Sequence, residues 1–246
     1  MMHTLRRKRV RVLVAILAAV LVLAIACVCY LGDYYRADTQ AIQAFSVAEG
    51  ITREAWADGT LAFVPENAGT GLIFYPGGKV EHTAYVPLME ALAARGVLCV
   101  LVEMPFRLAV LDVNAADGVR EKFPQVAQWY IGGHSLGGSM AASYLQAHTD
   151  AFAGLVLLGS YSTADLSASG LSVLSLYGSE DGVLNREKYA ECAANLPDGF
   201  AEVVIAGGNH AYFGMYGAQE RDGAASIANE AQILQAADEI ASFARK

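Results

Sequence analysis

Residues 131–138, which read IGGHSLGG, constrain the fold of this chain more than any other stretch. An apolar run precedes them over residues 126–131, and small residues dominate the stretch 139–148 that follows. Gly133 and Gly137 stand two positions on either side of Ser135, which is the spacing of a nucleophile elbow. A serine on so sharp a strand-to-helix turn has a strained backbone, and its neighbours must be small. The pattern predicts that the Ser135 hydroxyl projects above a sheet; the alternative is an ordinary glycine-rich turn with a buried serine.

The N-terminal stretch has the length and composition of a membrane span. Five basic residues stand before position 12, and residues 12–31 are uncharged and apolar. Twenty helical residues span about 30 Å, the thickness of a bilayer core. The flanking charge predicts residues 1–11 as a cytoplasmic tail, 12–31 as an uncleaved transmembrane anchor, and an extracytoplasmic body. Cleavage after the small-x-small pattern at 24–26, or lipidation at Cys27, would instead make it a signal.

The rest of the chain is acidic. It holds 12 basic and all 25 acidic residues, a net charge of −13, against −8 for the whole chain. Such a surface argues against nucleic acid as a partner. The four cysteines have no metal-type spacing, and they indicate no disulfide framework (Cys27, Cys29, Cys99 and Cys192). We therefore expect neither a metal nor a cofactor.

Behind the anchor, we expect residues 32–58 to form a stalk or linker and residues 59–246 to form one domain. Strands are predicted at 61–65, 72–75, 97–104, 126–131, 155–158, 171–177 and 200–205. Helices are predicted at 82–95, 139–148, 186–195 and 224–244, with 105–123 helical in part. This alternation predicts an α/β fold, a mostly parallel sheet with helices on both faces. The short spacing between 158 and 171 leaves no room for a large lid domain.

A serine hydroxyl needs a base, a group that orients the base, and donors for the oxyanion. His210 is the best candidate base, because a glycine-rich loop after the last predicted strand can bring it over Ser135; His82 is the second. For the orienting acid we favour Asp181, in the loop after the preceding strand. The alternatives are Glu180, its neighbour, and Asp165, after the strand before that. Ligands of such sheets bind beyond the carboxyl ends of the strands, where all these residues fall.

The order Ser135, Asp181, His210 is that of α/β-hydrolases. From about residue 61 onward the chain resembles this superfamily, and in particular the small bacterial "alpha/beta hydrolase fold-5" group. The stretches that carry the resemblance are FYPGGKV at 74–80, MPF at 104–106, GGHSLGG at 132–138 and GGNH at 207–210, with YG-x-Q at 216–219 and DG at 222–223. The resemblance implies a serine hydrolase fold with these three residues as its triad, and no particular substrate. Arg221 stands where the group would be expected to have a glycine.

The residue after the nucleophile supplies one oxyanion N–H, here that of Leu136. The second should come from the 76–78 turn, with Gly78 as the donor and the Lys79 N–H as the alternative. Lys79, Glu103 and Tyr212 are candidate substrate-binding residues. Glu103 also lies close enough in sequence to Arg107 for a local ion pair, and the apolar and aromatic residues at 212–216 could equally line an acyl pocket or pack against the closing helix.

These features together predict a membrane-tethered serine hydrolase of esterase type. It would cleave a carboxylic ester or thioester of a small-molecule or lipid-like substrate through an acyl-enzyme on Ser135. The alternatives are an amidase, peptidase or acyltransferase on the same triad, or a non-catalytic binding module built on the hydrolase fold. The sequence does not specify the oligomeric state.

Overall fold

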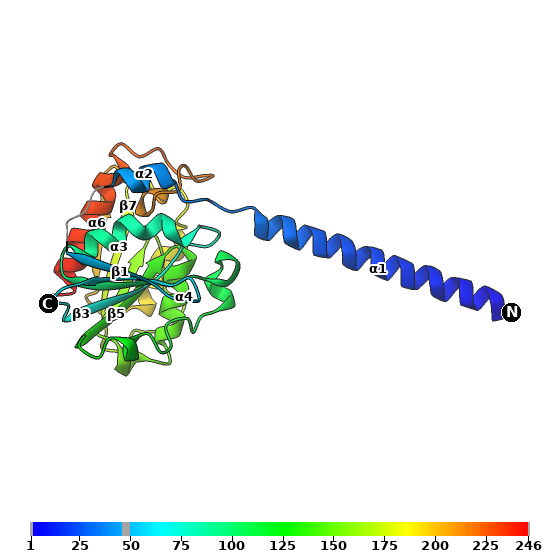
Figure 1. Cartoon of the computed structure of the whole chain (residues 1–246), viewed down its shortest axis with the longest axis horizontal. Helices are drawn as coiled ribbons and strands as arrows, with labels where there is room; N and C mark the ends of the chain where they lie inside the picture. Colours follow the sequence, from blue (N-terminus) through cyan, green and yellow to red (C-terminus); the bar gives the residue numbers. More distant parts are fainter. Residues whose placement is uncertain (1, 46–49, 246) are drawn as a thin grey trace. The chain divides into compact units, whose positions relative to one another are not determined.

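The computed structural model describes residues 2–45 and 50–245, which divide into two units, Met1–Tyr34 and Tyr35–Lys246 (Figure 1). The first unit consists mainly of helix α1 (Met2–Gly32). Its segment Leu13–Gly32 has a mean hydropathy of 3.0, and none of the residues in its most apolar stretch is buried against the rest of the described chain. The predicted apolar helix is therefore present, and it is long and apolar enough to cross a membrane.

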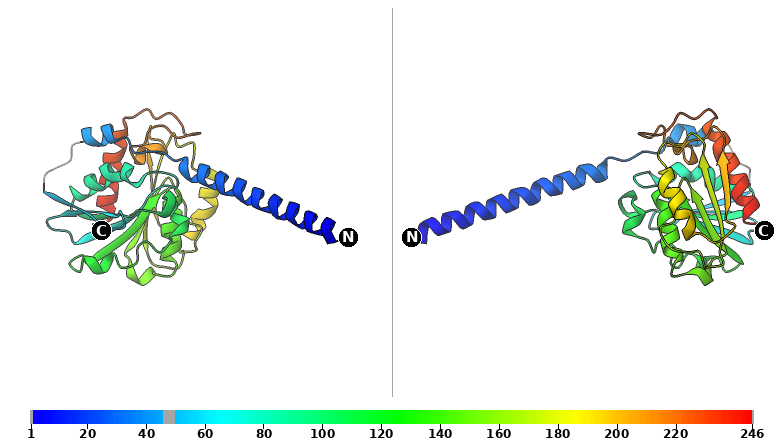
Figure 2. Two further views of the ribbon diagram at one scale, coloured as in Figure 1. Left: turned by 45° about the vertical axis from the view of Figure 1, so that its right-hand side comes forward. Right: turned by 180° about the vertical axis from the view of Figure 1, so that it is seen from behind.

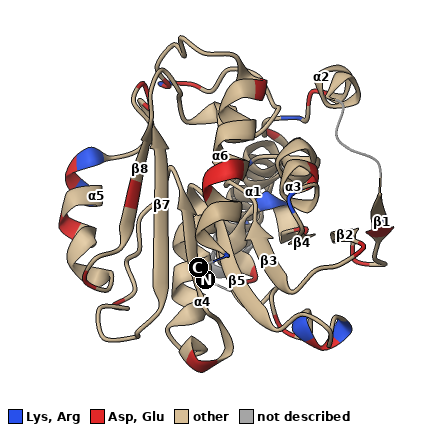
Figure 3. Ribbon diagram, turned by 90° about the vertical axis from the view of Figure 1, so that its left-hand side faces the viewer, with Lys and Arg blue, Asp and Glu red and all other residues tan. Residues whose placement is uncertain are grey.

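The second unit is built on one eight-stranded sheet in the order β1-β2-β4-β3-β5-β6-β7-β8, seen from β8 at one end to β1 at the other in Figure 3. Strands β3 to β8 run parallel, while β1 and β2 pair antiparallel at one side. The bounds of the strands are β1 Ile51–Ala55, β2 Leu61–Pro65, β3 Thr70–Tyr75, β4 Val97–Leu101, β5 Gln128–His134, β6 Gly154–Leu158, β7 Ser172–Gly178 and β8 Ala201–Ile205. The prediction of a mostly parallel sheet is confirmed.

Helices cover both faces of this sheet. On one face, α3 (Val86–Ala93) and α6 (Asn229–Phe243) pack onto side chains such as Leu72 and Phe74. On the other, α4 (Leu136–Leu145) packs onto Ile73 and Tyr75, and α5 (Arg186–Cys192) lies opposite α6 in Figure 2. Alternate residues of β3 thus enter different buried clusters. A strand buried on both faces reads as a continuous apolar run, which is why the central strands were predictable.

The compact unit begins earlier than the sequence indicated. The stretch 32–58, expected to be a linker, holds helix α2 (Thr39–Ala44) and strand β1. Asp38 caps α2 by accepting the Ala41 N–H at 3.0 Å, and the exposed side chains of β1 give it little apolar character. Arg53 on β1 forms an ion pair with the buried Glu90 of α3. An edge strand with one polar face carries a weak sequence signal, so the domain boundary was set too late.

Two predicted helices differ in the structure. The segment 105–123 contains only short 3₁₀ turns, at Pro105–Arg107, Ala109–Leu111 and Arg120–Lys122. Pro105 could begin a helix, but Phe106 and Arg107 have φ values of 52° and 61°, which end the helical turn at once. The last helix begins at Asn229, later than expected. Two further 3₁₀ turns adjoin helices, His82–Tyr85 before α3 and Ala193–Asn195 after α5. Two more lie in loops, at Thr149–Ala151 and Ala211–Phe213.

Candidate active site

Ser135 stands on the turn between β5 and α4 with φ of 52° and ψ of −122°, a left-handed conformation that side chains rarely adopt. Gly133 and Gly137 cannot be larger residues, because a side chain at either position would clash with the backbone of Tyr75. A Cβ on Gly133 would lie 2.5 Å from the Tyr75 carbonyl oxygen, and one on Gly137 would lie 2.2 Å from the same atom. The Ser160 hydroxyl donates to the Ser135 carbonyl at 2.7 Å and holds the turn from the other side. The predicted strand–turn–helix is therefore present at Ser135.

His210 and Asp181 form a buried pair beyond the ends of β8 and β7. The distance from His210 Nδ1 to Asp181 Oδ2 is 2.8 Å, and the two side chains are 1% and 0% exposed. The other carboxylate oxygen of Asp181 accepts the Val183 and Leu184 N–H groups at 2.9 and 2.7 Å. Because an ionised carboxylate only accepts, the proton sits on Nδ1 and the lone pair of His210 is on Nε2.

Gly159, at the end of β6, makes room for this pair. Its φ is +50°, and a Cβ there would lie 2.8 Å from His210 Nδ1 and 3.1 Å from Asp181 Oδ2. A side chain at this position would push the imidazole and the carboxylate apart. The sequence analysis did not single out this glycine.

A cavity of about 200 Å³ brings Ser135 and His210 together. Its wall consists of Ser135, Leu136, Ser139, Gly159, Ser160, Tyr161, Val183, Leu184, Asn185 and His210. The His210 Nε2 atom is buried and has no hydrogen-bond partner among the described residues. The residue that carries this unpartnered nitrogen therefore lines the same cavity as the strained serine.

The backbone N–H groups of the 77–79 turn have different partners. Gly77 donates to the Tyr85 hydroxyl at 3.1 Å, and Lys79 donates to the Arg107 carbonyl at 2.8 Å. The Lys79 N–H is thus occupied, which argues against it as an oxyanion donor. Gly78 lies between them, and its backbone faces the Leu136 side chain so closely that an added Cβ would lie 2.9 Å from Cδ2. Within the described residues, the N–H groups of Gly78 and Leu136 have no acceptor.

Tyr85 and His134 form a buried chain of contacts that ends at the His210 imidazole. The Tyr85 hydroxyl accepts from the Gly77 N–H, and its oxygen also hydrogen-bonds His134 Nδ1 at 2.8 Å. The rings of His134 and His210 lie 4.4 Å apart. Burial lowers the pKa of His134 well below its usual 6.5, and the neighbouring His210 acts in the same direction. His134 is therefore a neutral ring that links the 77–78 turn to His210.

A sequence model of the alpha/beta hydrolase family matches residues 71–234, which is most of the compact unit. The chain belongs to the alpha/beta hydrolase family. The resemblance inferred from the sequence is confirmed.

Solved structures of low sequence identity share this fold. The dienelactone hydrolase of Anabaena variabilis ATCC 29413 is 14% identical, with a TM-score of 0.59 over 79% of this chain and 97% of its own. Est1E of Butyrivibrio proteoclasticus is 14% identical, with a TM-score of 0.55 over 80% and 100%. A predicted CIB-like hydrolase of Thermoplasma acidophilum is 16% identical, with a TM-score of 0.54 over 78% and 98%. No curated protein sequence matches the chain.

Two residues that were not assigned from the sequence hold the loops of this candidate site together. The Asp222 carboxylate accepts backbone N–H groups from Gly182 and from His210 and Ala211, at 3.1, 3.2 and 2.8 Å. It therefore ties the Asp181 loop to the His210 loop. Gln232 of α6 is fully buried and bonds both the N–H and the carbonyl of Asn209, at 2.9 and 2.7 Å. The only signal for Asp222 in the sequence was the Asp-Gly pair of the family resemblance.

Arg221, beside Asp222, has a φ of +69°. This is the left-handed region that glycine adopts without strain, which explains why a glycine was expected here. The loop keeps its hydrogen bonds through Asp222 in spite of the arginine.

The alternative base and acids lie elsewhere. His82 Nε2 contacts the Gly59 carbonyl at 3.2 Å, and burial lowers the pKa of His82. The Glu180 carboxylate accepts from Ser179 at 2.9 Å, and the exposed Asp165 bonds Ser167. The structure does not bring these three side chains to the buried His210–Asp181 pair.

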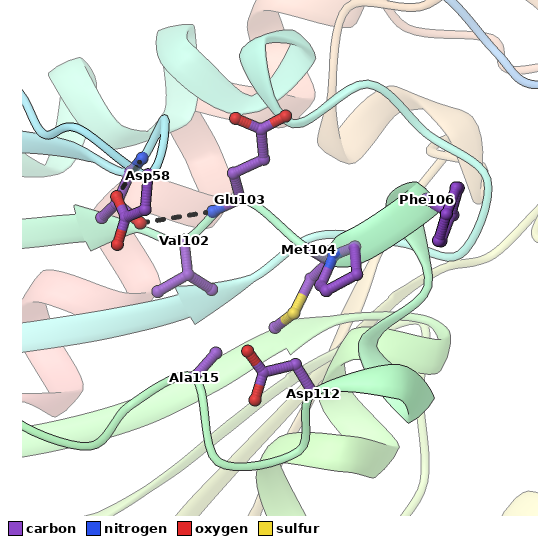
Figure 4. Close-up of a pocket in the computed structure, with 9 residues that line it drawn as sticks. Asp58, Val102, Glu103, Met104, Phe106, Asp112 and Ala115 are labelled. Atoms are coloured by element: carbon purple, nitrogen blue, oxygen red, sulfur yellow. Dashed lines mark hydrogen bonds between the residues drawn. The ribbon is translucent and has the colours of Figure 1, made fainter.

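The candidate substrate-binding residues are spread over other parts of the surface. Glu103 lines a separate cavity of about 380 Å³ with Asp58 and Asp112, and its carboxylate points away from that of Asp112 in Figure 4. Tyr212 lines a third cavity, next to Asn209. Lys79 is not in the wall around Ser135. Beyond Tyr212, the side chains of Phe213, Met215 and Tyr216 are buried in the cluster that includes α6, so they pack the core.

The depressed pKa of His134 predicts how stability depends on pH. The folded chain keeps His134 neutral, whereas an unfolded chain protonates it below about pH 6.5. The unfolded state then binds more protons, so the free energy of unfolding falls as the pH falls, by up to about 1.4 kcal/mol per pH unit for this residue. We expect the decline from pH 6.5 to pH 5 to be shallower in His134→Asn than in the natural chain. Denaturant titrations of both proteins at several pH values measure it, and equal slopes would contradict the assignment.

Proposed function

We propose that this alpha/beta hydrolase is a membrane-anchored serine hydrolase that cleaves a carboxylic ester or thioester. One observation carries the proposal. A histidine that is fixed by a buried aspartate, and whose Nε2 has no hydrogen-bond partner among the described residues, lines the same cavity as a serine with a φ of 52°. A base, an orienting acid and a strained hydroxyl in that arrangement are what nucleophilic acyl transfer requires.

In the first half of the reaction, Ser135 Oγ bonds to the substrate carbonyl carbon while His210 Nε2 takes the hydroxyl proton. The carbonyl oxygen becomes an oxyanion, which accepts the Gly78 and Leu136 N–H groups. The intermediate then expels the alcohol or thiol, which takes the proton from His210. In the second half, water gives a proton to His210 and attacks the acyl-enzyme, and Ser135 Oγ leaves with that proton. Asp181 stabilises the imidazolium in both halves.

Val183 and Leu184 give one part of this cavity an apolar wall, which suits the hydrocarbon part of an acyl group. A dienelactone hydrolase shares the fold, and so does Est1E, which has been solved with bound ferulic acid. A lactone is an ester, and ferulic acid is a carboxylic acid. These likenesses support an ester as the substrate. Amide hydrolysis and acyl transfer to another acceptor use the same residues, and a panel of substrates separates them.

The N-terminal helix supports membrane attachment. Its apolar segment Leu13–Gly32 follows a cluster of basic residues, and the positive-inside rule orients that cluster toward the cytoplasm. The hydrolase unit would then lie on the opposite side. Mass spectrometry of the protein purified from membranes distinguishes an intact anchor from cleavage after Ala26 or lipidation of Cys27.

A fluorophosphonate probe tests the proposed chemistry on the full chain. The expected result is one covalent adduct on Ser135, together with hydrolysis of at least one member of a panel of acyl esters and thioesters of varied chain length. A properly folded protein that gives no adduct on Ser135 would instead be a binding module on a hydrolase fold.

A further inference from the structure

Large apolar side chains are exposed together on the segment that follows β4. Phe106, Val110 and Leu111 are 59%, 54% and 55% exposed, and we call them the apolar loop. In the rest of the compact unit, the exposed large apolar side chains among the described residues are Val204 and Leu234, on separate elements. Phe106 and its neighbour Arg107 have φ values of 52° and 61°, so the backbone holds this segment in a strained conformation. Figure 4 shows the Phe106 ring standing apart from the other residues around the nearby cavity.

Backbone hydrogen bonds join this loop to the start of the compact unit. The Arg107 carbonyl accepts the Lys79 N–H at 2.8 Å, and the Lys79 carbonyl accepts the Tyr35 N–H at 2.8 Å. Tyr35 also pairs with Val80 in a parallel bridge. Helix α1 ends at Gly32, and three residues of extended chain reach about 11 Å at most. A chain that leaves the bilayer at Gly32 therefore enters the hydrolase unit close to the apolar loop.

The same loop adjoins the candidate active site. Lys79, which bonds Arg107, directly follows Gly78, whose backbone packs on Leu136 beside Ser135. The turn Ala109–Leu111 packs against α4, the helix that begins immediately after the serine. The apolar loop thus connects two places in the fold, the attachment point of the anchor and the elbow that carries the nucleophile.

We propose that the apolar loop inserts into the phospholipid bilayer and that acyl esters reach Ser135 from the lipid phase. This inference rests on the membrane anchor and hydrolase activity proposed above, and it specifies a lipid-like substrate. Apolar side chains at a membrane interface gain free energy by entering the acyl region. A bilayer also accounts for the exposure of three large apolar side chains beside the anchor's attachment point.

Tryptophan quenching by brominated lipid tests the contact directly. The full chain carrying Val110→Trp is reconstituted in phosphatidylcholine and phosphatidylglycerol vesicles with brominated acyl chains. Val204→Trp is the matched control, because Val204 is also an exposed valine (46%) but lies on β8, the edge strand of the sheet opposite β1. The natural chain gives the background from Trp56 and Trp129. We expect the emission added by Val110→Trp to fall at least about twofold, as for a lipid-buried ring, and that of Val204→Trp to stay unchanged.

Each outcome decides the proposal. Equal quenching of the two variants would overturn it. A blue-shifted Val110→Trp emission that brominated lipid does not quench would also overturn it, because a protein partner or a second copy would then cover the loop. Failure of the full chain to float with vesicles would overturn both the anchor and the loop. Quenching needs no turnover, so an inactive protein with no fluorophosphonate adduct still tests the loop separately from the hydrolase proposal.

A kinetic comparison tests the substrate route. The double variant Val110→Ser, Leu111→Ser should hydrolyse an ester embedded in vesicles about tenfold more slowly, because its loop no longer enters the lipid. Its rate on a soluble short-chain ester should stay within about twofold, since neither residue lines the Ser135 cavity. Equal losses on both esters would overturn delivery from the bilayer.

Discussion

Replacing Ser135 with alanine is expected to lower kcat for ester hydrolysis by about 10⁴- to 10⁶-fold. The change removes the nucleophile and leaves only binding and the oxyanion donors, which alone give a small fraction of the acceleration in serine hydrolases. The proposed acyl-enzyme would no longer form, so fluorophosphonate labelling should vanish together with turnover. Steady-state kinetics on the best ester of the panel, with a parallel labelling gel, measures both losses.

Ser143→Ala is the matched control for this loss. Ser143 lies on the same helix, α4, and is not part of the cavity wall. Its hydroxyl donates at 2.9 Å to the backbone carbonyl of Ser139, which is part of that wall. We expect its kcat to stay within about twofold, because Ser143 does not line the cavity and its hydroxyl bonds only the backbone of its own helix. If Ser135→Ala kept more than a hundredth of the activity while its circular dichroism matched the natural chain, the nucleophile would lie elsewhere.

The elbow was predictable because its requirements are local. Gly133 and Gly137 must be small for the β5–α4 turn to close against the Tyr75 carbonyl, and both positions are fixed by their spacing from Ser135. The central strands were predictable for a similar reason, since burial on both faces makes each of them a nearly uninterrupted apolar run. Local sterics and hydrophobic pattern therefore gave the fold class and the position of the candidate serine.

Other parts of the site depend on contacts between segments far apart in the chain. Tyr85, in the turn before α3, meets His134 at the end of β5 across 49 positions of the chain, and nothing in either local sequence indicates their 2.8 Å contact. Gly159 matters only because two loops converge on it. Sequence reasoning also grouped Glu103 and Tyr212 with Ser135 because all of them follow strand ends, but neighbouring strand ends can open into different cavities.

Asp181→Asn is expected to lower kcat by about 10⁴-fold without unfolding the protein. The Val183 and Leu184 N–H groups both point at one carboxylate oxygen, at 2.9 and 2.7 Å. An asparagine must place its amide oxygen there, because its NH₂ group would otherwise face two donors. The NH₂ then faces His210 Nδ1, which lies 2.8 Å from the second oxygen in the natural chain. Nδ1 must accept, so the imidazole proton moves to Nε2, and the nitrogen proposed to deprotonate Ser135 loses its lone pair.

Glu180→Gln separates this effect from a general loss of negative charge at the loop. Glu180 is the neighbouring acid, and its carboxylate bonds the Ser179 hydroxyl at the surface, so kcat should stay within about twofold. The rate of fluorophosphonate labelling should fall with kcat in Asp181→Asn, because both reactions need the hydroxyl proton to be removed. A folded Asp181→Asn protein that retained activity within tenfold of the natural chain, with a large loss in Glu180→Gln, would transfer the orienting role to Glu180. We expect a large loss in Asp181→Asn and little change in Glu180→Gln. Of the two acids, only Asp181 contacts both the imidazole and the two backbone donors that fix the orientation of the amide.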